Sequence, residues 1–280
     1  MCLLAAMLAA VDGAAAQMAK TDRTLPPFQD RLHLGLHLKA LGLKTGVELG
    51  VRTGDFAAAL LHIWPASRYM LVDAWRQLYS GQYSRELPSA YMRTMNQTIR
   101  RSNCEETFES AMAGGRCGTQ IQVCRNWTHV CAQLFEDHSI DFVYVDALHD
   151  YKGTLRDISM WWPKLRTGGV MAGHDYIDMN SSWMNHADAA KVRHWRRNYD
   201  ASWEPTGKLV KGAVDDFFDC RAVVRNEQVL TQDGACGHRR EVEVAPPRKW
   251  SHQLASALGS KLAPVKNSQD VYPPTWAVLK

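Results

Sequence analysis

Short apolar segments and amphipathic segments alternate along most of the chain. The apolar runs, bounded by Gly, Asp or Pro, are typical of buried strands, and the others carry apolar residues every three or four positions, as helices facing a sheet do. Strands are expected at 45–51, 69–74, 121–124, 141–147 and 169–172, with strand-like segments at 221–230 and 275–279. Helices are expected at 55–63, 88–101, 128–135, 153–165 and 210–220, with Thr128 as the cap of the third and Asp150 as a candidate cap of the fourth. This alternation predicts an α/β fold with a parallel sheet covered by helices on both faces.

Composition narrows the class of protein. The chain has 280 residues, of which 46% are hydrophobic and 22% charged, with ten Trp, so it is not a disordered chain. The formal net charge of +4 is too small to indicate a nucleic-acid partner. No apolar stretch reaches the length of about 18 residues that a membrane-spanning helix requires.

The N-terminal residues and two internal segments differ from the rest of the chain. Residues 1–16 contain a short apolar run followed by three alanines, which predicts a signal peptide or signal anchor, although no Lys or Arg precedes the run. A mis-assigned start or an Ala-rich tail is the alternative. Residues 17–33 are expected to form a linker and residues 34–280 one domain, with loop insertions at 177–205 and 234–273. The leader predicts a secreted protein or one of the secretory pathway, with a cytoplasmic location as the alternative.

Cysteines and glycosylation motifs favour the same compartment. Six cysteines follow Cys2, an even number that suits disulfides, and the pairs expected are Cys104 with Cys117 and Cys220 with Cys236. Cys124 and Cys131 have no partner assigned among the expected pairs, and the alternative to a disulfide is that both are free thiols buried as small apolar residues. Acceptor triplets for N-glycosylation begin at these asparagines: Asn96, Asn126 and Asn180.

Candidate chemistry begins in the turn after the first expected strand. Glu48, Gly50 and Gly54 form an E-x-G-x-x-x-G pattern, with Thr53 inside it. The glycines let the backbone turn tightly beside a ligand, and the carboxylate favours a cationic ligand over a pyrophosphate. Asp73 ends the second strand at the position where such folds bind the ribose hydroxyls of a nucleoside.

Two further strands also end in polar residues. Asp146 and His149 follow the fourth strand, and His174 and Asp175 follow the fifth. If these strands are neighbours, Asp146, His174 and Asp175 can share one divalent ion. His149 can accept a proton from a substrate hydroxyl near neutral pH. Each residue alone is more often a helix cap or a solvated loop residue, but four motifs at one sheet edge favour a site.

Together these motifs resemble the class I S-adenosylmethionine-dependent methyltransferases, and most closely the methyltransferase family 24 branch related to macrolide and sugar O-methyltransferases. The resemblance covers about residues 34–280. It is carried by VELGVRTGDF, YMLVDAW, DFVYVDALHDYKGTLRD, WWPKLRTGGVMAGHDY, VKGAVDDFF and TWAVLK.

The resemblance implies a Rossmann-like, doubly wound and mostly parallel seven-stranded sheet, with S-adenosylmethionine as the cofactor. It places the cofactor against seven residues: Glu48, Gly50, Thr53, Gly54, Asp73, Trp75 and Asn126. Glu48 and the glycines would surround the methionine portion, Asp73 the ribose, and the turn containing Asn126 the adenine. Trp75 would stack on a base or substrate, or else be an ordinary core aromatic.

On the acceptor side, the resemblance implies Mg²⁺ or another divalent cation held by Asp146, His174 and Asp175, with Asp146 and His149 as catalytic residues. His174 departs from an all-oxygen ligand set, so either Asp175 alone supplies the second ligand or a softer ion is bound. The expected reaction is O-methylation of a small sugar or phenolic acceptor, without nucleic acid, and a homo-oligomer is left open. The competing interpretations are an iron-dependent hydroxylase of the same fold and a non-catalytic cofactor- or glycan-binding protein.

Overall fold

The computed structural model describes most of the predicted domain. The described residues are 25–75, 120–181, 189–190, 192–225, 228–231, 240–245, 248–249, 271–272 and 274–280. The predicted signal peptide, the helix expected at 88–101 and four of the cysteines lie outside them, as does Asn96.

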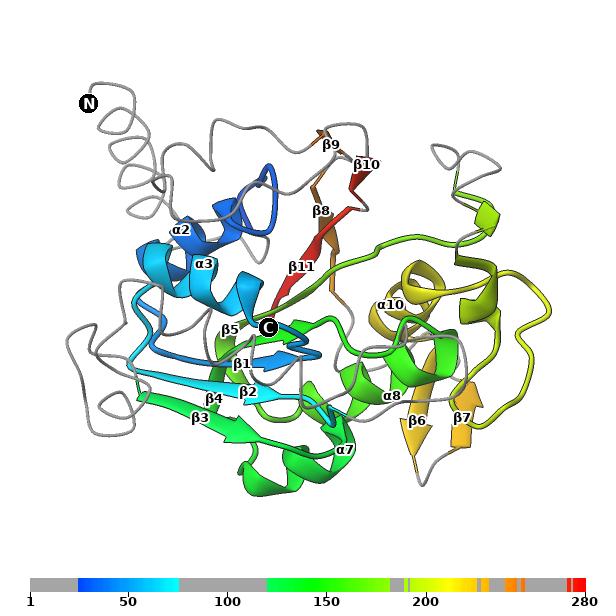
Figure 1. Cartoon of the computed structure of the whole chain (residues 1–280), viewed down its shortest axis with the longest axis horizontal. Helices are drawn as coiled ribbons and strands as arrows, with labels where there is room; N and C mark the ends of the chain where they lie inside the picture. Colours follow the sequence, from blue (N-terminus) through cyan, green and yellow to red (C-terminus); the bar gives the residue numbers. More distant parts are fainter. Residues whose placement is uncertain are drawn as a thin grey trace.

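A seven-stranded sheet forms the centre of the molecule (Figure 1), in the order β3-β2-β1-β4-β5-β11-β8. The strands are β1 (Thr45–Leu49), β2 (Arg68–Val72), β3 (Gln120–Cys124), β4 (Ile140–Val145), β5 (Leu165–Gly173), β8 (Glu243–Val244) and β11 (Trp276–Leu279). The first five are parallel, whereas β11 runs antiparallel to both β5 and β8. The predicted mostly parallel seven-stranded sheet is therefore confirmed, and its strand order reverses between β1 and β4.

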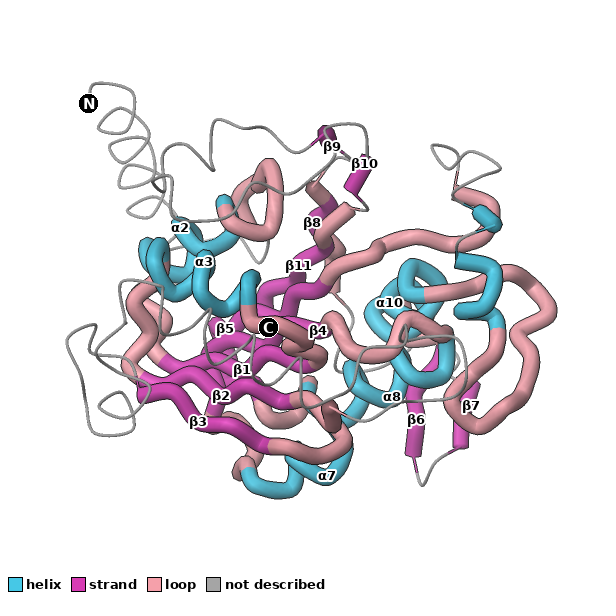
Figure 2. Tube along the Cα trace, in the orientation of Figure 1, coloured by secondary structure: helices cyan, strands magenta, loops and turns pink. Residues whose placement is uncertain are grey.

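Helices cover both faces of the sheet, as predicted. One face carries α2 (His33–Ala40) and α3 (Asp55–Ile63), and the other carries α7 (Thr128–Cys131), the 3₁₀ turn η1 (Ala132–Leu134), α8 (Tyr151–Trp161) and α10 (Val210–Phe218). Figure 2 shows α2 and α3 on the opposite side of the strands from α7. Two separate apolar clusters fill the interfaces, because successive residues of each central strand point to opposite faces.

Several predicted boundaries differ from the structure for identifiable reasons. The helix expected at 153–165 ends at Trp161, since Pro163 cannot continue it, and Leu165 already begins β5. The segment expected as one strand at 221–230 is a hairpin of β6 (Ala222–Arg225) and β7 (Gln228–Thr231), in a sheet of its own. A further small sheet pairs β9 (Arg248–Lys249) with β10 (Val271–Tyr272), inside the segment predicted as a loop insertion.

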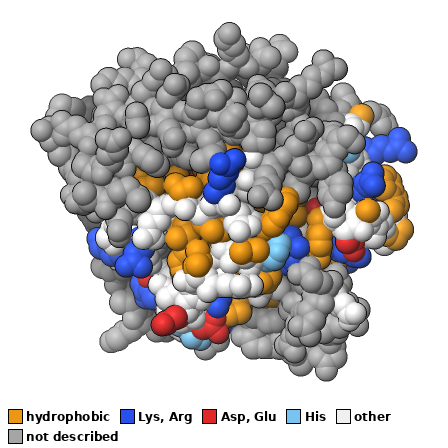
Figure 3. All heavy atoms as spheres, turned by 60° about the horizontal axis from the view of Figure 1, so that its bottom comes forward, with side chains coloured by type: hydrophobic (Ala, Val, Ile, Leu, Met, Phe, Trp, Pro, Cys, Tyr) orange, Lys and Arg blue, Asp and Glu red, His pale blue; other side chains and the backbone are white. Residues whose placement is uncertain are grey.

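The described surface is mixed in character. On the face turned forward in Figure 3, basic and acidic side chains are interspersed among apolar ones, in keeping with the small net charge of the sequence. No helix among the described residues has the length and apolarity needed to cross a bilayer.

Asp157 is a buried acid on α8 that faces the start of α7. Thr128 was expected to cap that helix, but the cap position belongs to Trp127, and the Thr128 hydroxyl instead donates to Asp157 Oδ1. The second oxygen, Oδ2, is buried without a hydrogen-bond partner among the described residues. Burial therefore raises the pKa of Asp157 to about 6.

We expect Asp157→Asn to stabilise the protein at pH 8, because the amide keeps an acceptor for Thr128 and removes a buried charge. The folded-state pKa lies above that of the unfolded chain, so the contribution of Asp157 to stability is full at low pH and is lost as the pH rises through about 6. Urea unfolding should give a gain of about 1–3 kcal/mol at pH 8 that shrinks toward pH 4.5. The exposed Glu136→Gln variant is the control, and a gain that is independent of pH would contradict the interpretation.

Candidate functional site

The turn after β1 lies directly against the end of β4. Gly50 and Gly54 have φ values of 85° and 77°, a backbone conformation that residues with a side chain rarely adopt. Gly54 is also the residue that caps the start of α3. A Cβ atom on Gly50 would meet the backbone oxygen of Asp146 at 2.1 Å. Glycine is thus required because two strand ends approach closely, and the turn borders the region beyond β4. Thr53, which lies in the turn, donates its hydroxyl to Asp55 in the first turn of α3.

Asp73 follows β2 and holds this turn in place. Its carboxylate accepts hydrogen bonds from the backbone amides of Arg52 at 2.9 Å and Trp75 at 2.7 Å. Burial raises the pKa of Asp73, although these backbone bonds oppose the rise. The Trp75 indole is itself buried and donates to the Arg52 carbonyl at 2.9 Å, so it supports the turn from within the core.

Glu48 is a buried carboxylate on the same sheet edge. Its Oε2 atom accepts a hydrogen bond from the Tyr69 hydroxyl at 3.4 Å. Burial raises its pKa well above the ordinary value, and the charge of Asp146 adds to this, as does the charge of Asp73. Glu48 is opposite Leu71 in the register of β1 and β2, and Asp73 follows Leu71 by two residues, so the two acids lie on the same face at the same edge of the sheet. A cationic ligand here would relieve the cost of the buried charge.

Two acids and one histidine converge beyond β4 and β5. His149 Nε2 lies 3.3 Å from Asp146 Oδ1 and 3.0 Å from Asp175 Oδ2. One ligand atom from each of these three residues lies within 4.8 Å of the other two. Burial disfavours the charged imidazole, but hydrogen bonds with Asp146 and Asp175 raise the pKa of His149 to about 10.

The grouped histidine differs from the one predicted as a ligand. His174 Nδ1 lies 3.3 Å from Asp175 Oδ1, the other oxygen of that carboxylate. The sequence shows that two histidines follow adjacent strands, but not which one turns toward Asp146. The group found consists of two carboxylates and an imidazole. Divalent transition-metal ions that bind both oxygen and nitrogen ligands take this set of donors.

The segment predicted as the first loop insertion reaches this group. The Trp195 ring, in the 3₁₀ turn η2 (Arg193–Arg196), stacks on His149 with centroids 4.4 Å apart and an angle of 22°. Asn198 Oδ1 accepts a hydrogen bond from the Lys152 amide, and the Arg156 guanidinium lies 4.0 Å above the Tyr199 ring. These contacts anchor the segment to the start of α8, where Asp150 is the predicted helix cap.

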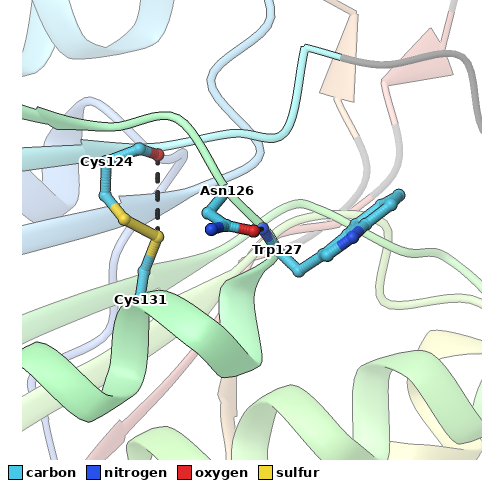
Figure 4. The surroundings of a disulfide bond; sticks show 4 residues. All are labelled: Cys124, Asn126, Trp127 and Cys131. Atoms are coloured by element: carbon cyan, nitrogen blue, oxygen red, sulfur yellow. Dashed lines mark hydrogen bonds between the residues drawn. A yellow bond between two sulfur atoms is a disulfide. The ribbon is translucent and has the colours of Figure 1, made fainter.

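A disulfide fixes the turn after β3. Cys124 and Cys131 are bonded, with Cα atoms 6.1 Å apart, so the alternative that they are free buried thiols is wrong. Asn126 and Trp127 lie in the loop that the bond closes (Figure 4). Asn126 is exposed, and its Oδ1 accepts from the Trp127 amide at 2.9 Å. Cys220 is also disulfide-bonded, as predicted, and its expected partner Cys236 lies outside the described residues.

Sequence reasoning missed two residues at the site, Arg31 and Tyr144. Arg31, from the segment predicted as a linker, places Nη1 3.8 Å from Asp146 Oδ2. Tyr144 lies on β4 opposite Glu48 of β1. Its hydroxyl is buried and lies against the Arg31 guanidinium. No spacing rule links residue 31 to the strand ends, whereas Tyr144 could have been found as a polar residue in an apolar strand.

A family model decides what kind of domain this is. Residues 47–176, from β1 to the residue after Asp175, match the model described as a methyltransferase domain. Residues 47–176 are thus a methyltransferase domain. The recognition made from the motifs is therefore confirmed, and the matched range contains the glycine turn, Asp73, and the group of Asp146, His149 and Asp175.

Solved structures with related folds include two O-methyltransferases. The Bacillus cereus enzyme, in a complex with SAH, is 13% identical, with 98% of this chain and 91% of that chain covered and a TM-score of 0.46. The enzyme TomG of Streptomyces achromogenes, involved in tomaymycin synthesis and in a complex with SAM, is 10% identical, with 98% and 89% covered and a TM-score of 0.46. No curated protein matches the chain.

Proposed function

We propose that the protein transfers a methyl group from S-adenosylmethionine to an oxygen atom of a small hydroxylated acceptor, such as a sugar or a phenol. One observation carries the proposal: Glu48 and Asp73 lie beside the glycine turn, at the ends of adjacent parallel strands. Ligands of such sheets bind outside the carboxyl ends of the strands, where strand order reverses.

The described residues fit the cofactor chemically. Asp73 has the charged oxygens that accept from two ribose hydroxyls, and Glu48 offers a buried negative charge to the cationic methionine portion. The Tyr144 hydroxyl supplies a buried polar group beside Arg31. We assign the adenine to the side of the disulfide-closed turn, near Asn126.

The acceptor belongs beyond β4 and β5. A methyl group on sulfonium is already activated, so the protein must align the acceptor oxygen and remove its proton. We assign cation binding to the carboxylates of Asp146 and Asp175, with His149 beside them, in place of the predicted set with His174. Proton removal is assigned to His149, whose pKa of about 10 would fall when a bound cation takes over the two carboxylates that hold its proton. A bound divalent cation would lower the pKa of the acceptor hydroxyl. The Trp195 ring beside His149 offers a flat apolar wall to a sugar or phenol ring.

We also propose that the protein works in an oxidising compartment of the secretory pathway or outside the cell. The support is that Cys124, Cys131 and Cys220 are all disulfide-bonded. Reducing compartments keep such thiols free.

Calorimetric titration with S-adenosylhomocysteine, with and without Mg²⁺ or Mn²⁺, tests the proposal. We expect binding without metal, because Glu48 and Asp73 are assigned to the cofactor and neither belongs to the group proposed to bind the cation. Transfer of labelled methyl groups from S-adenosylmethionine to a panel of sugars and phenols should then identify the acceptor class. Failure to bind S-adenosylhomocysteine under either condition would overturn the proposal, as would turnover that depends on 2-oxoglutarate instead.

A further inference from the structure

The segment before α2 places the positively charged side chain of Arg31 next to the candidate cofactor site. Leu25, Phe28 and Leu32 are buried in the cluster that also contains residues of α3, so the segment is part of the domain core. Asp30 Oδ1 accepts hydrogen bonds from the amides of Leu32 and His33, which fixes the turn into the helix. Arg31 lies within this fixed turn and points toward the sheet edge.

The Arg31 guanidinium sits among groups from three elements. It lies 5.1 Å from the centre of the Phe56 ring of α3, and its Nη1 atom is 3.8 Å from Asp146 Oδ2, just beyond β4. It also interacts electrostatically with Tyr144 and Glu48. The Arg31 side chain is 24% exposed, so it is not sealed inside the core.

This position has the chemistry needed for a carboxylate. The amino-acid portion of S-adenosylmethionine carries one ammonium and one carboxylate group, so its site needs an anion and a cation close together. Glu48 supplies the anion, and Arg31 supplies a planar set of donors that matches carboxylate geometry. The Tyr144 hydroxyl is buried beside Arg31 and is a second donor, because a hydroxyl oxygen that accepts from the guanidinium can still donate its own proton.

We propose that Arg31 and the Tyr144 hydroxyl bind the carboxylate of the cofactor's amino-acid portion, so that the segment before α2 completes the cofactor site. This inference rests on the proposed function. A different role is that Arg31 only neutralises Asp146, in which case it would act equally on every adenosine ligand. The 3.8 Å separation is long for a charge-assisted hydrogen bond and leaves guanidinium donors for another anion.

Removing the carboxylate from the ligand separates the two roles. Calorimetry should compare S-adenosylhomocysteine with S-adenosyl-3-thiopropylamine, which keeps the amine and lacks the carboxylate. For Arg31→Gln, we expect the affinity for S-adenosylhomocysteine to fall about 10- to 100-fold and that for the amine to change less than about twofold. Tyr144→Phe keeps the ring packed on Phe56 and should give a smaller loss with the same ligand selectivity. Arg68→Gln, on the exposed start of β2, is the matched control.

Three outcomes would overturn the inference. Equal losses for both ligands would show that Arg31 acts as a counter-ion of Asp146. Unchanged binding in both variants would show that neither residue touches the carboxylate. If the wild-type protein binds neither ligand, the proposed function itself fails, which distinguishes that failure from an error about Arg31. Tyr144→Phe keeps the test decisive even if Arg31→Gln folds poorly.

Discussion

Asp146→Asn is expected to lower kcat for methyl transfer by about 10²- to 10⁴-fold, the range that a lost acid–base or cation-binding group accounts for. The Asp146 side chain faces His149 and Arg31, whereas its backbone packs against Gly50. The amide therefore removes the charge while the strand ends keep their contact. Steady-state kinetics at saturating acceptor, with and without Mn²⁺, would measure the loss, and any stimulation by the cation should disappear with it.

The control for this variant is an acid of similar size away from the site. Asp137→Asn removes an exposed carboxylate that pairs with Lys164, and it should leave kcat unchanged. Circular dichroism and affinity for S-adenosylhomocysteine would show that Asp146→Asn is folded and still binds the nucleoside. Full turnover by that variant would remove Asp146 from the mechanism and leave the three-residue group as a structural ion pair.

The sheet and the grouping of Glu48 with Asp73 beside the glycine turn were predictable because local pattern determines them. Helix α3 matches its predicted range, 55–63, since an apolar face and a glycine before Asp55 define both its period and its start. Glu48 and Asp73 were placed together from their positions at the ends of successive strands, and parallel strands align those ends. Asp150 as the cap of α8 followed from its place before the helix.

The rest depends on tertiary contacts that spacing does not encode. His149 and His174 both follow strands, and only the backbone after each strand decides which ring reaches Asp146. Arg31 was missed because the segment around it has little regular period, yet its scattered apolar residues bury themselves against α3. Cys124 and Cys131 are seven residues apart, and their pairing required knowing that α7 folds back on the end of β3.

Asp73→Asn should weaken binding of S-adenosylhomocysteine by about 10- to 100-fold, because hydrogen bonds from the ribose hydroxyls to a charged acceptor contribute more than those to a neutral one. Asparagine is preferred to alanine, since Asp73 also accepts from the amides of Arg52 and Trp75 and asparagine keeps one of these bonds. At saturating cofactor kcat should change little, as Asp73 lies on the nucleoside side of the site.

A change in the ligand shows whether Asp73 contacts the ribose or only holds the glycine turn in place. The 2′,3′-dideoxy analogue of S-adenosylhomocysteine lacks both hydroxyls, so its affinity should be nearly the same for the wild-type protein and for Asp73→Asn. An equal loss for both ligands would mean that the carboxylate acts by bracing the turn through Arg52 and Trp75 rather than by contacting the ribose. In that case the glycine turn would remain at the cofactor, and the nucleoside would have to be held by other residues at the ends of β2 and β3.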